Sequence, residues 1–180
     1  MDNFFKRTWA EINLDAIRHN YTEIKQSLNP DTKICCVVKA DGYGHGASFV
    51  AKELERIGAE WFAVSNLEEA IQLRRSGVEG NMLILGYTPP QEAARLHEMN
   101  ISQTVFSYEY GKELAEHAVA AGVQVKIHIK VDTGMSRIGF LYQVPERDAA
   151  VIDEIEDVLI TDNELSIKAD IILDKIYSNG

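Results

Sequence analysis

The alternation of short apolar runs with segments of helical spacing is typical of an α/β protein built on a parallel sheet. Strand-like runs recur about every 20 to 26 residues, and a helix-like segment separates each pair of them. Two architectures fit this pattern: an open doubly wound sheet and a closed (β/α)8 barrel of the TIM type. A full barrel typically needs roughly 250 residues, whereas this chain has 180. Spacing alone does not separate an open sheet from an incomplete barrel.

The first two elements are expected to be a strand and a helix. Residues 8–14, TWAEINL, have the character of a strand. From Leu14 onward, apolar side chains recur every three or four residues and would line one face of a helix. This helix should end before Pro30 and Asp31. Its apolar positions are Leu14, Ile17, Tyr21, Ile24 and Leu28.

The next strand, residues 34–38, is apolar at every position. Such a run predicts burial on both faces, as in the middle of a parallel sheet. Cys35 and Cys36 would point to opposite faces of this strand, so a disulfide between them is not expected. We interpret both as reduced core residues of a cytoplasmic protein.

The remaining elements follow the same alternation. Asn66 is placed to cap a helix, and a proline opens the helix of residues 89–99. Near the end of the chain, apolar spacing predicts an amphipathic helix that Asn163 or Ser166 could cap; its apolar positions are Leu165, Ala169, Ile172 and Ile176. Other helices are expected at about residues 47–57, 66–75, 108–121 and 145–159, and strands at about 61–64, 82–85, 104–106 and 123–131.

Composition and charge narrow the classes of function. The formal net charge is -10, and an acidic chain lacks the basic patches that nucleic acid or an anionic membrane surface requires. Neither is therefore expected as a partner. The first residues lack the apolar region of a signal peptide, which favours a cytoplasmic location. The five histidines show neither H-x-x-H nor H-E-x-x-H spacing, so no metal site is expected.

A lysine followed by alternating glycines is the most informative feature. Lys39 ends the apolar run of residues 34–38, and Gly42, Gly44 and Gly46 follow it. The carboxyl ends of parallel strands carry the binding site in both candidate architectures. The glycines permit positive φ and would leave N–H groups free for an anion near the helix that starts at Ala47. The pattern favours a phosphorylated ligand, or a carbonyl cofactor held by the lysine as a Schiff base. The alternative is a strand-end lysine that simply reaches solvent.

The same glycines formally match the dinucleotide fingerprint G-x-G-x-x-G/A. The context argues against that match, because the next strand ends in Ser65 and Asn66 rather than in the acidic residue that would bind a ribose. A nucleotide site is therefore not expected.

Three segments resemble bacterial alanine racemases, pyridoxal-phosphate enzymes whose cofactor domain is a (β/α)8 barrel: AEINLDAIRHNY, VVKADGYGHG and HIKVDTGMSRIGF. The resemblance implies that Lys39 binds pyridoxal 5′-phosphate through a Schiff base and acts as one of two acid/base groups. It implies that Tyr43 reaches the phosphate and that Arg137 lies beside the phenolic oxygen of the cofactor. Lys130 matches a lysine that is often carbamylated and then bridges to that arginine. From the residues alone, Arg137 could instead pair with Asp132 at a strand end.

The resemblance runs from about Trp9 to Asp157. It implies a partial barrel domain over residues 1–157, with about five barrel strands and an extra N-terminal strand. Residues 158–180 are expected to form a divergent helical tail, and the family's C-terminal β domain is expected to be absent. In this homodimeric family that domain supplies a tyrosine, the second acid/base group, to the partner subunit.

The implied activity is the interconversion of L-alanine and D-alanine for peptidoglycan. Without the opposite-face acid, the isolated chain is expected to be inactive. Two alternatives stay open: a non-catalytic pyridoxal-phosphate-binding barrel protein, and an inert gene fragment that binds nothing.

Overall fold

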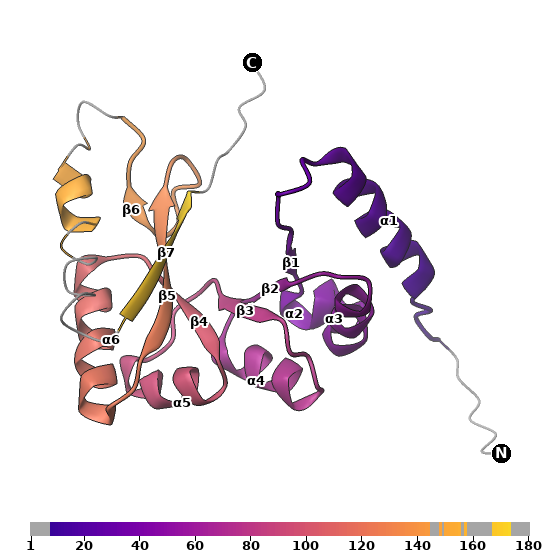
Figure 1. Cartoon of the computed structure of the whole chain (residues 1–180), viewed down its shortest axis with the longest axis horizontal. Helices are drawn as coiled ribbons and strands as arrows, with labels where there is room; N and C mark the ends of the chain where they lie inside the picture. Colours follow the sequence, from indigo (N-terminus) through magenta and orange to yellow (C-terminus); the bar gives the residue numbers. More distant parts are fainter. Residues whose placement is uncertain (1–7, 145–147, 149, 156, 158–166, 174–180) are drawn as a thin grey trace.

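The computed structural model describes residues 8–144, 148, 150–155, 157 and 167–173. Its core is a parallel sheet in which each strand pairs with the next along the chain, in the order β1-β2-β3-β4-β5 (Figure 1). These strands are β1 (Cys35–Val37), β2 (Trp61–Val64), β3 (Asn81–Ile84), β4 (Ile101–Val105) and β5 (Val125–Asp132). Sequential parallel pairing is the arrangement of a (β/α)8 barrel rather than of a doubly wound sheet, whose strand order reverses. The described sheet does not close, so the fold is an incomplete barrel, as predicted.

Two further strands pair with β5. Val131 pairs with Phe140 of β6 (Phe140–Leu141) and also with Leu173 of β7 (Ile167–Leu173). A strand residue has one neighbour on each side, so β6 and β7 lie on opposite sides of β5. Since β4 and β7 both pair with Ile127, β7 occupies the side away from β4. Strand β7 therefore extends the parallel sheet, and β6 continues the β4 side beyond the end of β4.

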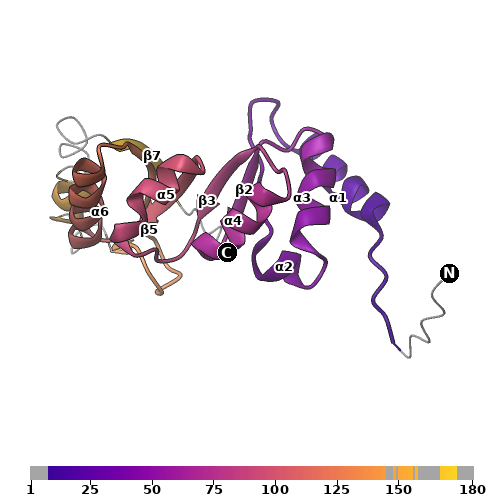
Figure 2. The same cartoon turned by 90° about the horizontal axis from the view of Figure 1, so that it is seen from below.

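Helices cover one face of this sheet. Helix α1 (Leu14–Ser27) precedes β1 and packs against α3 (Ala47–Arg56). The later helices follow the strands in order and lie on the outer side of the arc that the strands describe in Figure 1, and Figure 2 views this side from below. Three of the helices have side-chain N-caps: Asn13, Asn66 and Ser107 each accept a hydrogen bond from a backbone N–H of the first turn, and of these Asn66 was predicted. The helices are α1 (Leu14–Ser27), α2 (Lys39–Tyr43), α3 (Ala47–Arg56), α4 (Leu67–Arg75), a 3₁₀ turn (Pro90–Glu92), α5 (Ala93–Glu98) and α6 (Tyr108–Ala121).

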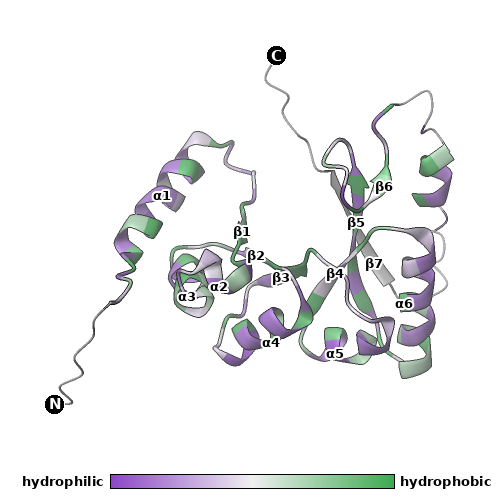
Figure 3. Cartoon of the chain, turned by 180° about the vertical axis from the view of Figure 1, so that it is seen from behind, coloured by the Kyte–Doolittle hydropathy of each residue, from purple (hydrophilic) through white to green (hydrophobic). Residues whose placement is uncertain are grey.

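Alternate strand residues pack against these helices and form the main core. In Figure 3 the helices carry both hydrophilic and hydrophobic segments, as expected of elements that pack on one side and meet solvent on the other. The buried strand residues of this layer include Phe62, Val64, Met82, Ile84, Ile101, Val105, Ile127 and Ile129. Within the described part of the chain, no helix is both long enough and apolar enough to cross a membrane.

The other face of the sheet, here called the inner face, is strongly curved. Trp61 on β2 and His128 on β5 make an edge-to-face contact there, with ring centroids 5.3 Å apart. In a flat sheet these strands would lie about 14 Å apart, three strand spacings. The contact therefore requires the curvature of a barrel wall. This curvature also explains why inner-face residues such as Leu83 and Thr104 are buried although helices cover only the outer face.

The structure does not contain the strand that was expected at the start of the chain. Residues 8–13 are not part of a strand, and helix α1 already begins at Leu14. A strand is stable only when a neighbour completes its ladder of hydrogen bonds. Residues 8–13 pair with none of the described strands, and Trp9 is 68% exposed. These residues have the composition of a strand, but they lack a described partner strand to pair with.

The prediction that β1 is buried on both faces is also wrong. Cys35 and Val37 are exposed and Cys36 is half-buried, because β1 is the edge strand of the described sheet. Neither cysteine belongs to the buried core, although both are free thiols as predicted. Burial, and to a lesser extent the neighbouring Cys35, raises the pKa of Cys36 to about 11. That thiol therefore stays protonated at neutral pH.

The C-terminal tail is not helical where the structure describes it. Residues 167–173 form β7, and the rest of the expected tail helix lies outside the described residues. The physical reason is twofold: β5 offers an unpaired edge, and the segment also alternates apolar and polar residues from Ile167 to Ile171. A fourth, smaller difference concerns β4, which begins at Ile101 rather than 104 because Ile101 pairs with Met82. The helix expected at 145–159 is helical at every position of it that the structure describes.

Candidate active site

Lys39 stands at the carboxyl end of β1. The strand ends at Val37, and Lys39 is the first residue of the short segment α2. Its side chain is half-buried, and its Nζ lies 6.0 Å from the centre of the Tyr43 ring. The structure therefore brings together two of the four predicted site residues, on one turn at the barrel mouth.

The turn that follows Lys39 is left-handed. Ala40, Asp41, Gly42 and Tyr43 have φ values of 50°, 52°, 63° and 55°. The backbone closes this turn through hydrogen bonds from Gly42 to the Val38 carbonyl (2.9 Å) and from Gly44 to the Ala40 carbonyl (3.2 Å). Each non-glycine residue in this region costs roughly 1–2 kcal/mol. Such a conformation persists only where the surroundings hold it.

Two carboxylates hold the turn. Asp41 Oδ1 accepts the backbone N–H of Ala47 at 2.8 Å and so fixes the start of α3. Glu69, on α4, accepts the N–H of Ala40 through Oε1 and the N–H of Ser65 through Oε2, both at 2.8 Å. The bonds tie the turn to the neighbouring helix and to the end of β2.

The structure contradicts the prediction that the glycine turn offers free N–H groups to an anion. The glycine positions were expected to leave N–H groups free, but these groups donate within the turn itself. The N–H of Gly46 bonds to the Asp41 carbonyl at 2.8 Å, and that of Ala47 bonds to the Asp41 side chain. The donors that are already committed belong to Gly42, Gly44, His45, Gly46 and Ala47. The glycines serve the backbone conformation instead: Gly46, with φ of 81°, is the N-cap of α3.

The loop after β5 carries Arg137 and is organised by Asp132. The carboxylate of Asp132 accepts backbone N–H groups from Ser136 (2.9 Å), Gly134 (3.0 Å) and Arg137 (3.2 Å). The N–H of Ser136, followed by that of Gly134, lowers the pKa of Asp132 below its usual range. Asp132 thus meets the backbone of Arg137, and the expected alternative of a simple side-chain ion pair is not what the structure shows. The Arg137 side chain is exposed.

Lys130 lies on β5, two residues before Asp132, so both project to the inner face with His128. Lys130 is half-buried. The predicted residues therefore form two groups: Lys39 with Tyr43 after β1, and Lys130 with Arg137 on and after β5. Both groups lie at the carboxyl edge of the parallel sheet. In a closed eight-stranded barrel the first and fifth strands stand opposite each other across the mouth.

Sequence reasoning missed Glu69 as a site residue. A signal was present, because Asn66 and Glu69 have the spacing of a capping box, in which the fourth residue reaches back toward the N-cap. The Asn66 side chain does accept the Glu69 N–H at 2.9 Å. The carboxylate itself reaches Ser65 and, across the strands, Ala40. That second contact joins residues 29 apart in sequence, which local spacing does not reveal.

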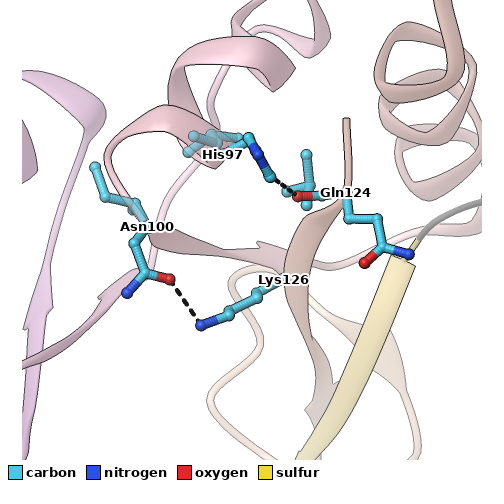
Figure 4. Close-up of a pocket in the computed structure, with 7 residues that line it drawn as sticks. His97, Asn100, Gln124 and Lys126 are labelled. Carbon is cyan, nitrogen blue, oxygen red and sulfur yellow. Dashed lines mark hydrogen bonds between the residues drawn. The ribbon is translucent and has the colours of Figure 1, made fainter. Parts of the chain in front are cut away.

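A separate pocket of about 180 Å³ lies at the opposite edge of the sheet, where β4 and β5 begin (Figure 4). Its polar groups already bond to one another. His97 Nδ1 is 2.7 Å from the Gln124 carbonyl, and Lys126 donates to the Asn100 side chain at 2.7 Å. Among the described residues, no group of three or more histidine, cysteine or acidic side chains could hold a metal ion.

The fold and site define a barrel-type α/β protein with an amine at the mouth of its first parallel strand. Comparison with known proteins gives the family. The model of the alanine racemase N-terminal domain matches residues 12–161. The alanine racemase of Desulfovibrio desulfuricans is 49% identical over 150 residues, which are 83% of this chain and 40% of that protein. Alanine racemase 1 of Caldanaerobacter subterraneus is 45% identical over 134 residues, 74% of this chain and 34% of that protein.

Solved structures agree with the sequence matches. Alanine racemase of Clostridium difficile 630, in complex with cycloserine, superposes with a TM-score of 0.82 at 39% identity, covering 94% of this chain and 44% of that one. Histidine racemase from Leuconostoc mesenteroides gives a TM-score of 0.71 at 28% identity, covering 90% and 42%. The chain belongs to the alanine racemase family and matches its N-terminal domain. It spans less than half the length of these relatives.

Proposed function

We propose that this chain is the cofactor-binding portion of an alanine racemase that uses pyridoxal 5′-phosphate. The observation that carries the proposal is the placement of Lys39 at the carboxyl end of β1, on a left-handed turn that also carries Tyr43. A half-buried amine at a strand mouth suits condensation with an aldehyde, and the relatives named above are alanine racemases.

The residues present fit the cofactor in part. Lys39 would bind its aldehyde, the hydroxyl of Tyr43 would donate to its phosphate, and Arg137 would place a positive charge beside its phenolic oxygen. The backbone of the glycine turn contributes no further donors from the five N–H groups that are already bonded. When bound, the cofactor supplies an electron sink for the charge left when the substrate loses its α-proton. Lys39 Nζ would take or return that proton on one face. Lys130, once carbamylated and therefore negatively charged, would bridge to Arg137 from β5.

Racemisation also needs an acid/base group on the opposite face of the substrate. We propose that residues 1–157 form the racemase-type barrel portion and residues 158–180 a divergent tail, and that the second group comes from elsewhere in a homodimeric, cytoplasmic enzyme. The isolated chain should then bind the cofactor without turnover. This expectation keeps a non-catalytic pyridoxal-phosphate-binding protein as the second candidate. The acidic net charge of the chain gives no support to nucleic acid or a membrane as a partner.

Reductive trapping tests the first part of the proposal. The full chain is incubated with pyridoxal 5′-phosphate, reduced with borohydride, digested and mapped by mass spectrometry. We expect a pyridoxyl adduct on Lys39 that is absent in Lys39→Ala. A chain that forms no adduct on Lys39 would be the inert fragment instead.

A second assay tests activity and substrate. L-alanine and, because a structural neighbour is a histidine racemase, L-histidine are offered separately to the loaded chain. We expect neither D isomer to accumulate. Formation of D-alanine that disappears in Lys39→Ala would show that the chain is a complete catalyst.

A further inference from the structure

Glu69 bridges the ends of two neighbouring strands. Its Oε1 accepts the N–H of Ala40, directly after Lys39, and its Oε2 accepts the N–H of Ser65, directly after β2. Both distances are 2.8 Å. The side chain is half-buried and springs from the first turn of α4, whose cap residue Asn66 accepts the Glu69 N–H. The capped first turn of α4 thus holds the Glu69 carboxylate beside the backbone of Ala40 and Ser65.

The ladder between β1 and β2 does not extend to the Ala40 N–H, which bonds to Glu69 instead. Its last rung is the bond from Val38 to the Ala63 carbonyl, at 2.9 Å. The next acceptor along β2 would be the Ser65 carbonyl. This carbonyl packs closely against Gly86: a Cβ added to Gly86 would lie 2.5 Å from the Ser65 oxygen. The chain at Ala40 has also turned into the left-handed region. The Glu69 carboxylate takes the place of the missing rung.

This bond fixes the peptide unit that joins Lys39 to Ala40. Ala40 is the first left-handed residue of the turn, a conformation that is unfavourable for a residue with a side chain. Holding its N–H restrains the backbone on both sides of this peptide unit, namely ψ of Lys39 and φ of Ala40. Without that bond, the turn loses one of the contacts that keep it left-handed.

We propose that Glu69 is a positioning residue for the Lys39 amine. The proposal rests on the proposed function, because it assumes that Lys39 is the reactive group. Glu69 would act through the backbone of Ala40 and would not itself contact the cofactor or substrate.

The test uses two isosteric variants of the full chain. Glu69→Gln keeps the shape of the side chain but turns one acceptor oxygen into an N–H₂ group, so one of the two backbone N–H groups loses its partner. Glu68→Gln is the matched control, since Glu68 is exposed on the same turn of α4. Three measurements are made: amide hydrogen exchange at Ala40 and Ser65 without cofactor, the thermal midpoint of unfolding, and selective capture of pyridoxal 5′-phosphate.

In the capture measurement, the neutral Lys39 amine adds to the aldehyde carbon, a C=N bond forms and water leaves. Borohydride then delivers hydride to that bond, and water supplies the proton to nitrogen. The readout is the ratio of adducts at Lys39 and at Lys112, an exposed lysine on α6. A variant that is merely less stable would show a lower thermal midpoint. A lower adduct ratio at an unchanged thermal midpoint therefore indicates a loss of positioning.

For Glu69→Gln we expect exchange at Ala40 or Ser65 to accelerate at least about tenfold and the adduct ratio to fall by about tenfold. Glu68→Gln should match the unsubstituted chain in both. Unchanged exchange in Glu69→Gln, or faster exchange with an unchanged adduct ratio, would overturn the positioning role while leaving the proposed function standing. Equal capture at Lys39 and Lys112 in the unsubstituted chain would overturn the proposed function, and the role of Glu69 with it.

Discussion

At the scale of single residues, carboxylates rather than cations do most of the organising at the barrel mouth. Asp41 and Glu69 hold the turn that carries Lys39, and Asp132 holds the loop that carries Arg137. In each case the acceptor is charged and the donors are backbone N–H groups, a combination that makes strong hydrogen bonds. The loops that carry Lys39 and Arg137 are therefore held by carboxylate-to-backbone hydrogen bonds.

Asp132 should make stability depend on acid. Its pKa is held below the usual range in the folded chain by the N–H of Ser136 first, so the folded state binds the proton less readily than the unfolded state. The resulting stabilisation is present above the unfolded pKa, near 4, and disappears as the pH falls through the lower folded value. We expect the urea midpoint of Asp132→Asn to lie below that of the unsubstituted chain at pH 7, and the two to converge near pH 2.

The control for this prediction is Asp31→Asn, at an exposed loop position. It should lie close to the unsubstituted chain at both pH values. A constant difference between Asp132→Asn and the unsubstituted chain from pH 7 to pH 2 would mean that the carboxylate acts by shape and not by charge.

The resemblance to alanine racemases picked out Lys39 and Tyr43, which the structure places on one turn. Sequence reasoning could not find the bond from Glu69 to Ala40, because that contact depends on how β1 and β2 align. It also misjudged the glycines. Positive φ was correctly expected at Gly42, Gly44 and Gly46, but whether an N–H stays free depends on which carbonyl the turn brings to it.

At the scale of elements, a single arginine joins the loops at the opposite edge of the sheet. The Arg74 guanidinium donates to four carbonyls, those of Gly80 (2.7 Å), Val78, Met99 and Asn100 (2.9 Å each). Burial lowers the pKa of Arg74, while Glu55 and Glu79 oppose this effect. The contacts connect α4 with the segments that lead into β3 and β4.

Arg74→Met should therefore destabilise the chain by about 2–4 kcal/mol, because several carbonyls lose their donor. Arg75→Met, one residue away and exposed, should change the free energy of unfolding by less than about 0.5 kcal/mol. Chemical denaturation of the two variants measures the difference. Equal effects would show that the four bonds contribute little beyond the side-chain volume.

The pairing of β7 with β5 can be tested through the backbone. Removing residues 158–180 leaves the β7 side of β5 without a neighbour, so amide exchange between residues 125 and 131 should accelerate by at least about tenfold. The amides of β2 and β3, which β7 does not touch, serve as the internal reference. If exchange in β5 is the same in both chains, β7 does not protect that edge in solution.

Most elements could be predicted because local pattern and pairing agreed. Trp61–Val64 and Tyr108–Ala121 are observed with the expected bounds, since turn signals and caps flank them. The failures lie where pairing decided. Residues 8–13 resemble a strand but have no described partner, whereas residues 167–173 fit helical spacing and nevertheless pair with β5. Propensity is a weak guide when a sheet edge is present in one place and missing in another.

At the scale of the whole molecule, the described sheet is a curved wall with an exposed edge at β1. Val37 is 42% exposed on that edge, and its strand presents unpaired backbone groups. The sequential strand order could be predicted from the repeat of βα units, but the exposure of β1 could not, because an apolar run looks the same at an edge as in the middle of a sheet.

The β1 edge should make the isolated chain associate. Val37→Lys places a charge on the edge and should shift the chain toward monomer in sedimentation or size-exclusion measurements. Val119→Lys, at a valine of similar exposure (47%) on α6, is the control and should leave the association unchanged. Equal behaviour of the two variants would indicate an interface elsewhere.

The left-handed turn after Lys39 has a stereochemical consequence. The backbone angles of Ala40 are those that mirror-image amino acids prefer, since inverting the α-carbon inverts the allowed region. A D-enantiomer introduced at position 40 by chemical ligation would relieve misfit there, whereas the same inversion at Ala51, inside the right-handed helix α3, would introduce it. Among the described residues, the segment beside Lys39 is thus one of a few places where ordinary chirality works against the fold.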